Sequence, residues 1–215
     1  MCIVYKCRLD DKSAYFEGHC AEANNTISRR DFERMLSRRQ LGKISTATQI
    51  ACVMFQYFSI NDKLREVGCD PTNVPIVICN RYANWDYVAE VMSPSIEETM
   101  RGVNSYVATA WFPATVQGHL TIANRNIGEA ITISTKDKDM ICATIDALMP
   151  RGNQSTGAVI MGTFESVPGQ IAGRNITGQR LSSFGALSMI RSNDSANNIG
   201  LAVHAHQGMY GNDTK

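Results

Sequence analysis

The sequence lacks the features that mark membrane-spanning and secreted proteins. No apolar run approaches the roughly 18 residues that a membrane span needs, and the N-terminus, Met-Cys-Ile-Val-Tyr-Lys, has no signal-peptide layout. The seven cysteines are odd in number, widely scattered, and include no Cys-x-x-Cys pair. That pattern argues against a disulfide framework and favours a reduced compartment. We therefore predict a cytoplasmic protein.

An excess of either charge is also missing. Lys and Arg number 21 against 20 Asp and Glu, which gives a formal net charge of +1. No global field therefore favours nucleic acid or a membrane surface. The glycine-bearing loop at residues 151–157 lacks P-loop spacing, so it does not indicate a nucleotide site. We expect no cofactor, no nucleic-acid partner and no membrane attachment.

The patterns that are present indicate one α/β domain. Apolar residues repeat at steps of three and four from Leu41 to Phe58, which predicts a five-turn helix. A shorter helix at residues 61–67 stops at Gly68, and residues 73–79 form a strand apolar enough to be buried on both faces. A helix paired with a buried strand is typical of α/β folds. We expect the domain to cover residues 1–206, followed by a polar, disordered tail at 207–215.

The middle of the chain predicts a strand, a polar elbow and a helix. A helix at residues 113–125 and a turn at 126–128 precede a strand at 130–134, an elbow at 135–139 and a helix at 140–149. Further strands are predicted at 158–164, 183–191 and 199–204. In α/β enzymes such an elbow places a nucleophile at a helix N-terminus. Here the elbow carries Lys136, Asp137, Lys138 and Asp139, with no Cys or Ser at its tip.

Several strings resemble, in order, the N-terminal half of the β-ketoacyl synthase family, within the thiolase-like superfamily. They lie between about residues 30 and 190, at 34–42, 74–78, 112–122, 126–134 and 158–162. The resemblance implies a thiolase-like half: a layered α/β domain with helices on both faces of its sheet. In this family two similar halves pack together, and a further dimer usually forms across the central strands.

The departures from that family concern the nucleophile. Aligned without gaps from Gly128, the family's nucleophilic Cys falls at Asp137, with Lys136 before it. An Asp cannot form the acyl thioester that condensation needs, and Cys142 falls inside the following helix, where a buried core position is expected. The family's paired catalytic histidines belong to the C-terminal half, which this sequence does not include. The resemblance therefore implies a truncated, divergent member that lacks condensing activity.

Other candidate residues each have a structural alternative. Lys136, Asp137 and Lys138 form either a rebuilt site, with Lys as base or Schiff-base nucleophile, or a solvated helix start capped by an Asp. His119 is either a packing residue or a catalytic base. His204 and His206, two residues apart, would share one face of a strand, but no third ligand lies nearby in sequence. We therefore predict no metal site.

A basic run of Arg29, Arg30, Arg34, Arg38, Arg39 and Lys43 lies within fifteen residues. Such a run is either a solvated face or a docking surface for an acidic partner. The resemblance implies an acyl carrier protein as that partner, with Arg34, Arg38, Arg39 and Lys43 as the docking residues.

Three functions follow from these observations. The first is a non-catalytic ketosynthase-like subunit of a fatty-acid or polyketide pathway, acting as a chain-length-factor-like partner or as a scaffold for a ketosynthase and a carrier protein. The second is a divergent acyl-thioester enzyme that uses Asp137, Lys136 or His119. The third is a structural or regulatory binding module on the same fold. Because half of a two-half fold exposes an apolar layer, we expect a homodimer or a complex rather than a free monomer.

Overall fold

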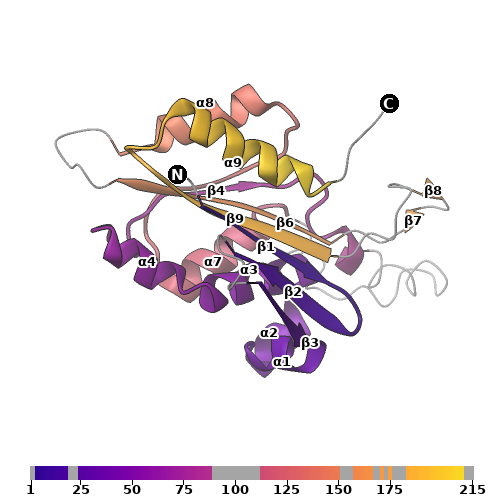
Figure 1. The fold of residues 1–215 in the computed structure, drawn as a ribbon. Helices are drawn as coiled ribbons and strands as arrows, with labels where there is room; N and C mark the ends of the chain where they lie inside the picture. The colour runs from indigo at the N-terminus through magenta and orange to yellow at the C-terminus, as the bar shows by residue number, and fades with distance from the viewer. Residues whose placement is uncertain are drawn as a thin grey trace.

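The computed structural model describes residues 3–18, 24–88, 112–150, 157–166, 170–171, 174–175 and 183–210. Their centre is a mixed seven-stranded sheet in the order β3-β2-β1-β9-β6-β4-β5 (Figure 1). β4 runs parallel to β5 and β6, whereas β9 runs antiparallel to β6 and β1. A separate two-stranded sheet pairs β7 with β8. The strands are β1 Ile3–Leu9, β2 Ser13–Glu17, β3 Asn25–Ser28, β4 Ile76–Cys79, β5 Ala130–Ile133, β6 Ala158–Glu165, β7 Gln170–Ile171, β8 Arg174–Asn175 and β9 Ser183–Arg191.

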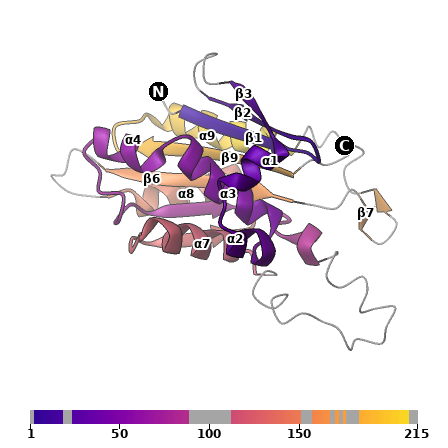
Figure 2. The same cartoon turned by 90° about the horizontal axis from the view of Figure 1, so that it is seen from below.

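Helices cover both faces of the large sheet, as the resemblance implied (Figures 1 and 2). One face carries α3 Thr46–Tyr57, α4 Ile60–Glu66 and α7 Thr115–Asn124. The other carries α8 Lys138–Leu148 and α9 Ala196–Gly208. Two short helices, α1 Arg29–Arg34 and α2 Arg38–Lys43, lie near the β2–β3 end of the sheet. The predicted α/β class and single domain are therefore confirmed.

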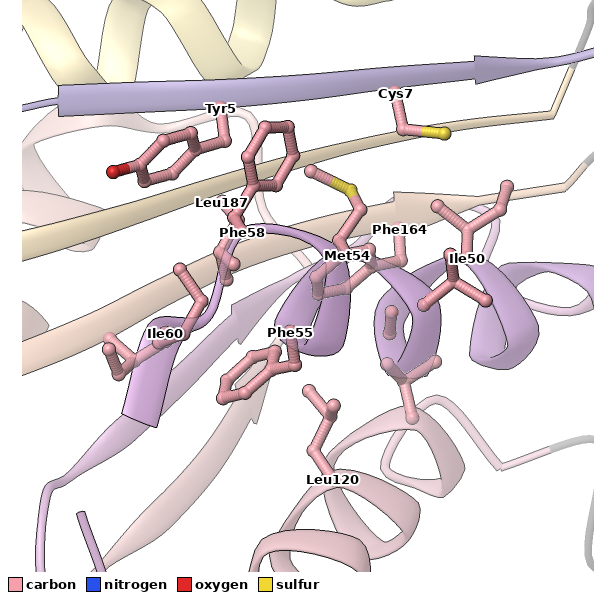
Figure 3. Close-up of a cluster of buried hydrophobic side chains, with 14 of the residues drawn as sticks. Tyr5, Cys7, Ile50, Met54, Phe55, Phe58, Ile60, Leu120, Phe164 and Leu187 are labelled. Carbon is pink, nitrogen blue, oxygen red and sulfur yellow. The ribbon is translucent and has the colours of Figure 1, made fainter. Parts of the chain in front are cut away.

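The larger core lies between α3 and the sheet (Figure 3). Ile50 and Met54 of α3 face Phe164 of β6, and all three side chains are buried. Gly185 of β9 permits this close approach, because a Cβ there would lie 2.7 Å from both Ile50 Cγ2 and Met54 Sδ. A second core under α8 and α9 is formed by the opposite face of the sheet together with Ile141, Ile145 and Val203.

The prediction of one continuous five-turn helix at residues 41–58 is wrong about its continuity. The structure has two helices there, α2 and α3, separated at Ile44 and Ser45. Ser45 has extended backbone angles, and its hydroxyl accepts the N–H of Thr48, so it caps α3. The apolar periodicity crosses the break because both helices pack apolar side chains inward.

The strand predicted at residues 199–204 is also wrong, because these residues belong to α9. Ser195 caps this helix, and Ile199, Ala202, Val203 and His206 follow the helical spacing of its packed face. The helix passes residue 206, where the domain was expected to end, and Tyr210 still contacts β6 through Glu165. By contrast, β9 has the bounds that were predicted for it.

The hairpin of β2 and β3 was missed in the sequence. Its signal is the short alternation in β2, where Ala14 and Phe16 are buried and Tyr15 is exposed. Residues 85–88, which follow the loop after β4, are helical. No helix in the described part of the chain is long and apolar enough to cross a membrane.

Candidate functional site

Three parallel strands end at one edge of the sheet. β6 ends in Glu165, β4 is followed by Asn80, and β5 is followed by the elbow at residues 134–137. These strands are neighbours, in the order β6-β4-β5. In α/β sheets the carboxyl ends of parallel strands are where ligands bind. This edge is therefore the candidate site, and it holds the elbow residues singled out in the sequence, Lys136, Asp137 and Lys138.

The elbow has the predicted strand–elbow–helix shape, and Asp137 stands at its tip as the N-cap of α8. The Asp137 carboxylate accepts the backbone N–H groups of Asp139 and Met140, at 2.9 and 3.2 Å from Oδ1. The Asp137 N–H donates to the hydroxyl of Thr135. Asp137 is exposed to solvent, and its negative charge lies at the positive end of the helix. Asp137, which the sequence predicts to lie at the family's nucleophile position, thus caps a helix.

The two elbow lysines are exposed, so neither has the desolvated amine that a nucleophilic Lys needs. Lys138 Nζ lies 3.1 Å from His204 Nδ1 on α9. The backbone carbonyl of Lys136 accepts a hydrogen bond of 2.9 Å from the side-chain amide of Gln207. Both contacts tie the elbow to the end of α9.

His119 is not part of the elbow. It lies on α7, which covers the opposite face of the sheet from α8 (Figure 1). Its side chain is half-buried, and this burial lowers the pKa of the imidazole below its ordinary value. The structure therefore does not bring His119 together with Lys136 and Asp137.

The two C-terminal histidines point in different directions. His204 is exposed, whereas His206 is buried between α9 and the sheet. His206 Nδ1 lies 3.0 Å from Thr163 Oγ1, and Nε2 lies 2.9 Å from Ser188 Oγ. Both ring nitrogens are thus engaged. Within the described ranges no group of three metal-ligating side chains is present.

A buried carboxylate that the sequence reading missed lies at the end of β6. Glu165 is fully buried, and it accepts the backbone N–H groups of three successive residues, Arg81, Tyr82 and Ala83. Ala83 has φ 52°, a left-handed conformation that is uncommon for alanine. Burial raises the pKa of Glu165, and these hydrogen bonds oppose the rise. The signal in the sequence is a Glu that ends an otherwise apolar strand.

Tyr210 completes this cluster. Its hydroxyl donates to Glu165 Oε1, and the guanidinium carbon of Arg81 lies 4.0 Å from the centre of its ring. Phe184 and Tyr82 meet the ring edge-on, at centroid distances of 5.2 and 6.3 Å. Burial and the charge of Glu165 raise the pKa of Tyr210.

The described cysteines are not activated. Burial raises the pKa of Cys7 and Cys79 to about 12 and that of Cys52 to about 11. Cys142, half-buried on α8, has a pKa raised by burial and by the charge of Asp139. Reactive thiols need a lowered pKa, so none of these cysteines has the environment of a nucleophile.

The basic run lies on α1 and α2. Arg34 pairs with Asp31 at 2.9 Å, and Arg29 pairs with Glu33 at 2.8 Å. Arg38 is exposed at the start of α2, and Lys43 is exposed at its end. The side chain of Arg39 lies outside the described residues. Six basic and two acidic residues lie between positions 29 and 43, so the surface keeps a positive balance.

Comparison with known proteins identifies the fold. No protein-family model matches the sequence, and neither does any curated protein. The chain is similar to a structure of a type II polyketide synthase acyl-carrier protein in complex with its ketosynthase bound to the hexaketide, with a TM-score of 0.57 and 20% identity. It is also similar to a ketosynthase in complex with its chain length factor from Xenorhabdus doucetiae, with a TM-score of 0.50 and 11% identity.

The coverage of these matches is unequal. In the first, 74% of this chain aligns with 50% of the matched chain, so this chain spans about half of that neighbour. In the second, 82% of this chain aligns with 74% of the matched chain. At these identities the likeness shows the fold alone, which is of the ketosynthase type.

Proposed function

We propose that this chain is a non-catalytic ketosynthase-like subunit. It acts in a polyketide or fatty-acid pathway as a chain-length-factor-like partner, or as a scaffold, for a ketosynthase and its acyl carrier protein. The observation that carries the proposal is Asp137. A ketosynthase-type fold keeps its strand–elbow–helix, while the residue at the nucleophile's place caps α8 with its carboxylate.

The electrostatic setting of the elbow supports this role. A condensing site needs a thiolate that is stabilised by a helix N-terminus. Here two of the N–H groups at the start of α8 are already engaged by Asp137. The described cysteine closest in sequence, Cys142, lies one turn further along α8 with a raised pKa.

The basic surface of α1 and α2 supports the carrier protein as a partner. Acyl carrier proteins are acidic in the resembled family, and an exposed basic face steers an acidic partner toward its docking position. Arg38, Arg39 and Lys43 of α2, with Arg34 of α1, form the proposed docking surface. Arg34 also binds Asp31, so we expect Arg38 to contribute more to carrier binding than Arg34.

Exposed apolar side chains support a protein partner in addition to the carrier. Met140 of α8 and Leu201 of α9 are 53% and 66% exposed in the layer that covers one face of the sheet. β5 ends the order of the described strands, and its four residues are half-buried. Exposed apolar patches and open strand edges favour association. A ketosynthase is the partner that we propose for them.

The test combines intact mass with binding. The chain is incubated with an acylated carrier protein, and we expect carrier binding without a covalent acyl adduct on the chain. Arg38→Glu should weaken that binding at least severalfold, whereas Arg125→Glu, at an exposed basic position at the end of α7, should leave it unchanged. An acyl adduct on the chain, or equal binding by both variants, would contradict the proposal.

The two alternatives are separated by further measurements. An enzyme using Asp137, Lys136 or His119 is not favoured, because His119 lies in the opposite helix layer from the elbow. Turnover of acyl-carrier substrates that falls in the Ala variants of these residues would restore it. A binding module with other partners predicts that native pull-down recovers neither a carrier protein nor a ketosynthase.

A further inference from the structure

The last four described residues, Gln207–Tyr210, contact the ends of all three parallel strands. Gln207 donates to the Lys136 carbonyl in the elbow after β5. The hydroxyl of Tyr210 donates to Glu165, the last residue of β6. The ring of Tyr210 lies against the guanidinium of Arg81, two residues beyond β4. The C-terminal end of α9 and the two residues after it therefore join three segments that are far apart in sequence.

The contacts of Tyr210 form a socket, which we define as Arg81, Tyr82, Glu165 and Phe184. A cation faces the ring, two aromatic rings meet it edge-on, and a buried carboxylate accepts its hydroxyl. Each geometry is a favourable one for a phenol. The socket thus matches both the apolar ring and the polar tip of the side chain that occupies it.

The β4 loop depends on the same carboxylate. Three successive backbone N–H groups, from Arg81 to Ala83, point at Glu165, and Ala83 has the left-handed φ of 52°. Left-handed angles outside glycine persist only where neighbouring contacts hold them. Tyr210 adds a hydrogen bond to Glu165 from outside this loop.

We propose that Gln207–Tyr210 is a latch that holds the β4 loop and the elbow as one unit. In the latched state Tyr210 fills the socket and Gln207 fixes the Lys136 carbonyl. Release of Tyr210 empties the socket and loosens residues 81–83. Because Gln207 lies at the same end of α9 as Tyr210, release also weakens the contact of Gln207 with the elbow. A partner that draws Gln207–Tyr210 away from the socket thereby acts on the candidate site. This inference is independent of the proposed carrier and ketosynthase partners.

Hydrogen exchange followed by mass spectrometry tests the coupling in the full chain. Tyr210→Phe removes one hydroxyl, and we expect peptides covering residues 80–84 to exchange roughly tenfold faster, in line with the loss of one hydrogen bond to a charged group. The elbow peptide at 135–140, which Tyr210 does not touch, should also exchange faster. Peptides from β6 and β9 should keep their protection. Tyr15→Phe, the same change at an exposed position on β2, should alter neither segment.

Acceleration confined to residues 80–84, or no acceleration at all, would overturn the latch. If Tyr210→Phe accelerates exchange throughout the molecule, a rescue experiment tests whether the socket itself controls exchange at residues 80–84. Tyr210→Gly leaves the socket empty, and added p-cresol, which is the tyrosine side chain as a free molecule, should restore slow exchange at residues 80–84. Toluene should restore less, because it cannot donate to Glu165. Equal rescue by toluene, or no rescue by p-cresol, would show that the socket does not recognise a phenol.

Discussion

His206 and Ser188 are joined by a hydrogen bond of 2.9 Å between Nε2 and Oγ, and both side chains are buried. Ser188 lies on β9 and His206 on α9, so the bond fixes the helix against the sheet. The second ring nitrogen bonds to Thr163 on β6. Complete burial, with Lys6 adding a positive charge, lowers the pKa of His206 to about 3.

Stability should therefore decrease in mild acid. In the unfolded chain the imidazole takes up a proton near its ordinary pKa of 6.5, whereas in the folded chain it stays neutral until about pH 3. The contribution of neutral His206 is fully present above pH 6.5 and is lost as pH falls through this window, by about 1.4 kcal/mol per pH unit at most. Urea unfolding should show a loss of about 2 kcal/mol between pH 7 and 5 from this group.

His206→Gln keeps hydrogen-bonding atoms and removes the titration, so its free energy of unfolding should vary less between pH 7 and 5. His204→Gln, at the exposed neighbouring position, should keep the slope of the wild type. Equal slopes in all three proteins would contradict a buried neutral imidazole.

Asp137 should act on stability through its cap. Asp137→Ala removes the acceptor of the Asp139 and Met140 N–H groups and should lower the free energy of unfolding by about 1 kcal/mol, within the range measured for N-caps. Asp137→Asn keeps an oxygen there and should lose only a few tenths of a kcal/mol. Chemical denaturation of the three proteins measures the difference. An Ala variant as stable as the wild type would mean that the cap is not important.

Substitution of two glycines by Ala should change the stability of the protein in opposite directions. A Cβ at Gly128 would lie 2.8 Å from the Val74 carbonyl oxygen, and backbone cannot move aside as a flexible side chain can. Gly128→Ala should therefore destabilise the protein by about 1–3 kcal/mol. Gly118 lies inside α7 with no heavy atom near the added Cβ, so Gly118→Ala should stabilise it by up to about 1 kcal/mol. Thermal and urea unfolding of both variants measure the change in the free energy of unfolding. Destabilisation by both substitutions would contradict the predicted difference between the two sites.

The sequence alone determined the local features of this protein. The apolar run of β9, the stop at Gly68 and the strand–elbow–helix around Asp137 each depend on neighbouring residues, and all three are present in the structure. The fold class followed from the same patterns, because the spacing of apolar residues within a short segment indicates whether it is a helix or a strand and which face is buried.

Tertiary structure decided what depends on distant residues. The run at residues 199–204 is short and apolar, so its period fits a strand or a helix, and packing on α8 and the sheet selects the helix α9. Glu165 and Tyr210 are 45 residues apart, and Glu165 binds a loop more than 80 residues before it. No local sequence pattern predicts these contacts of Glu165, because they form only when the sheet order places β6 beside β4 and under the end of α9.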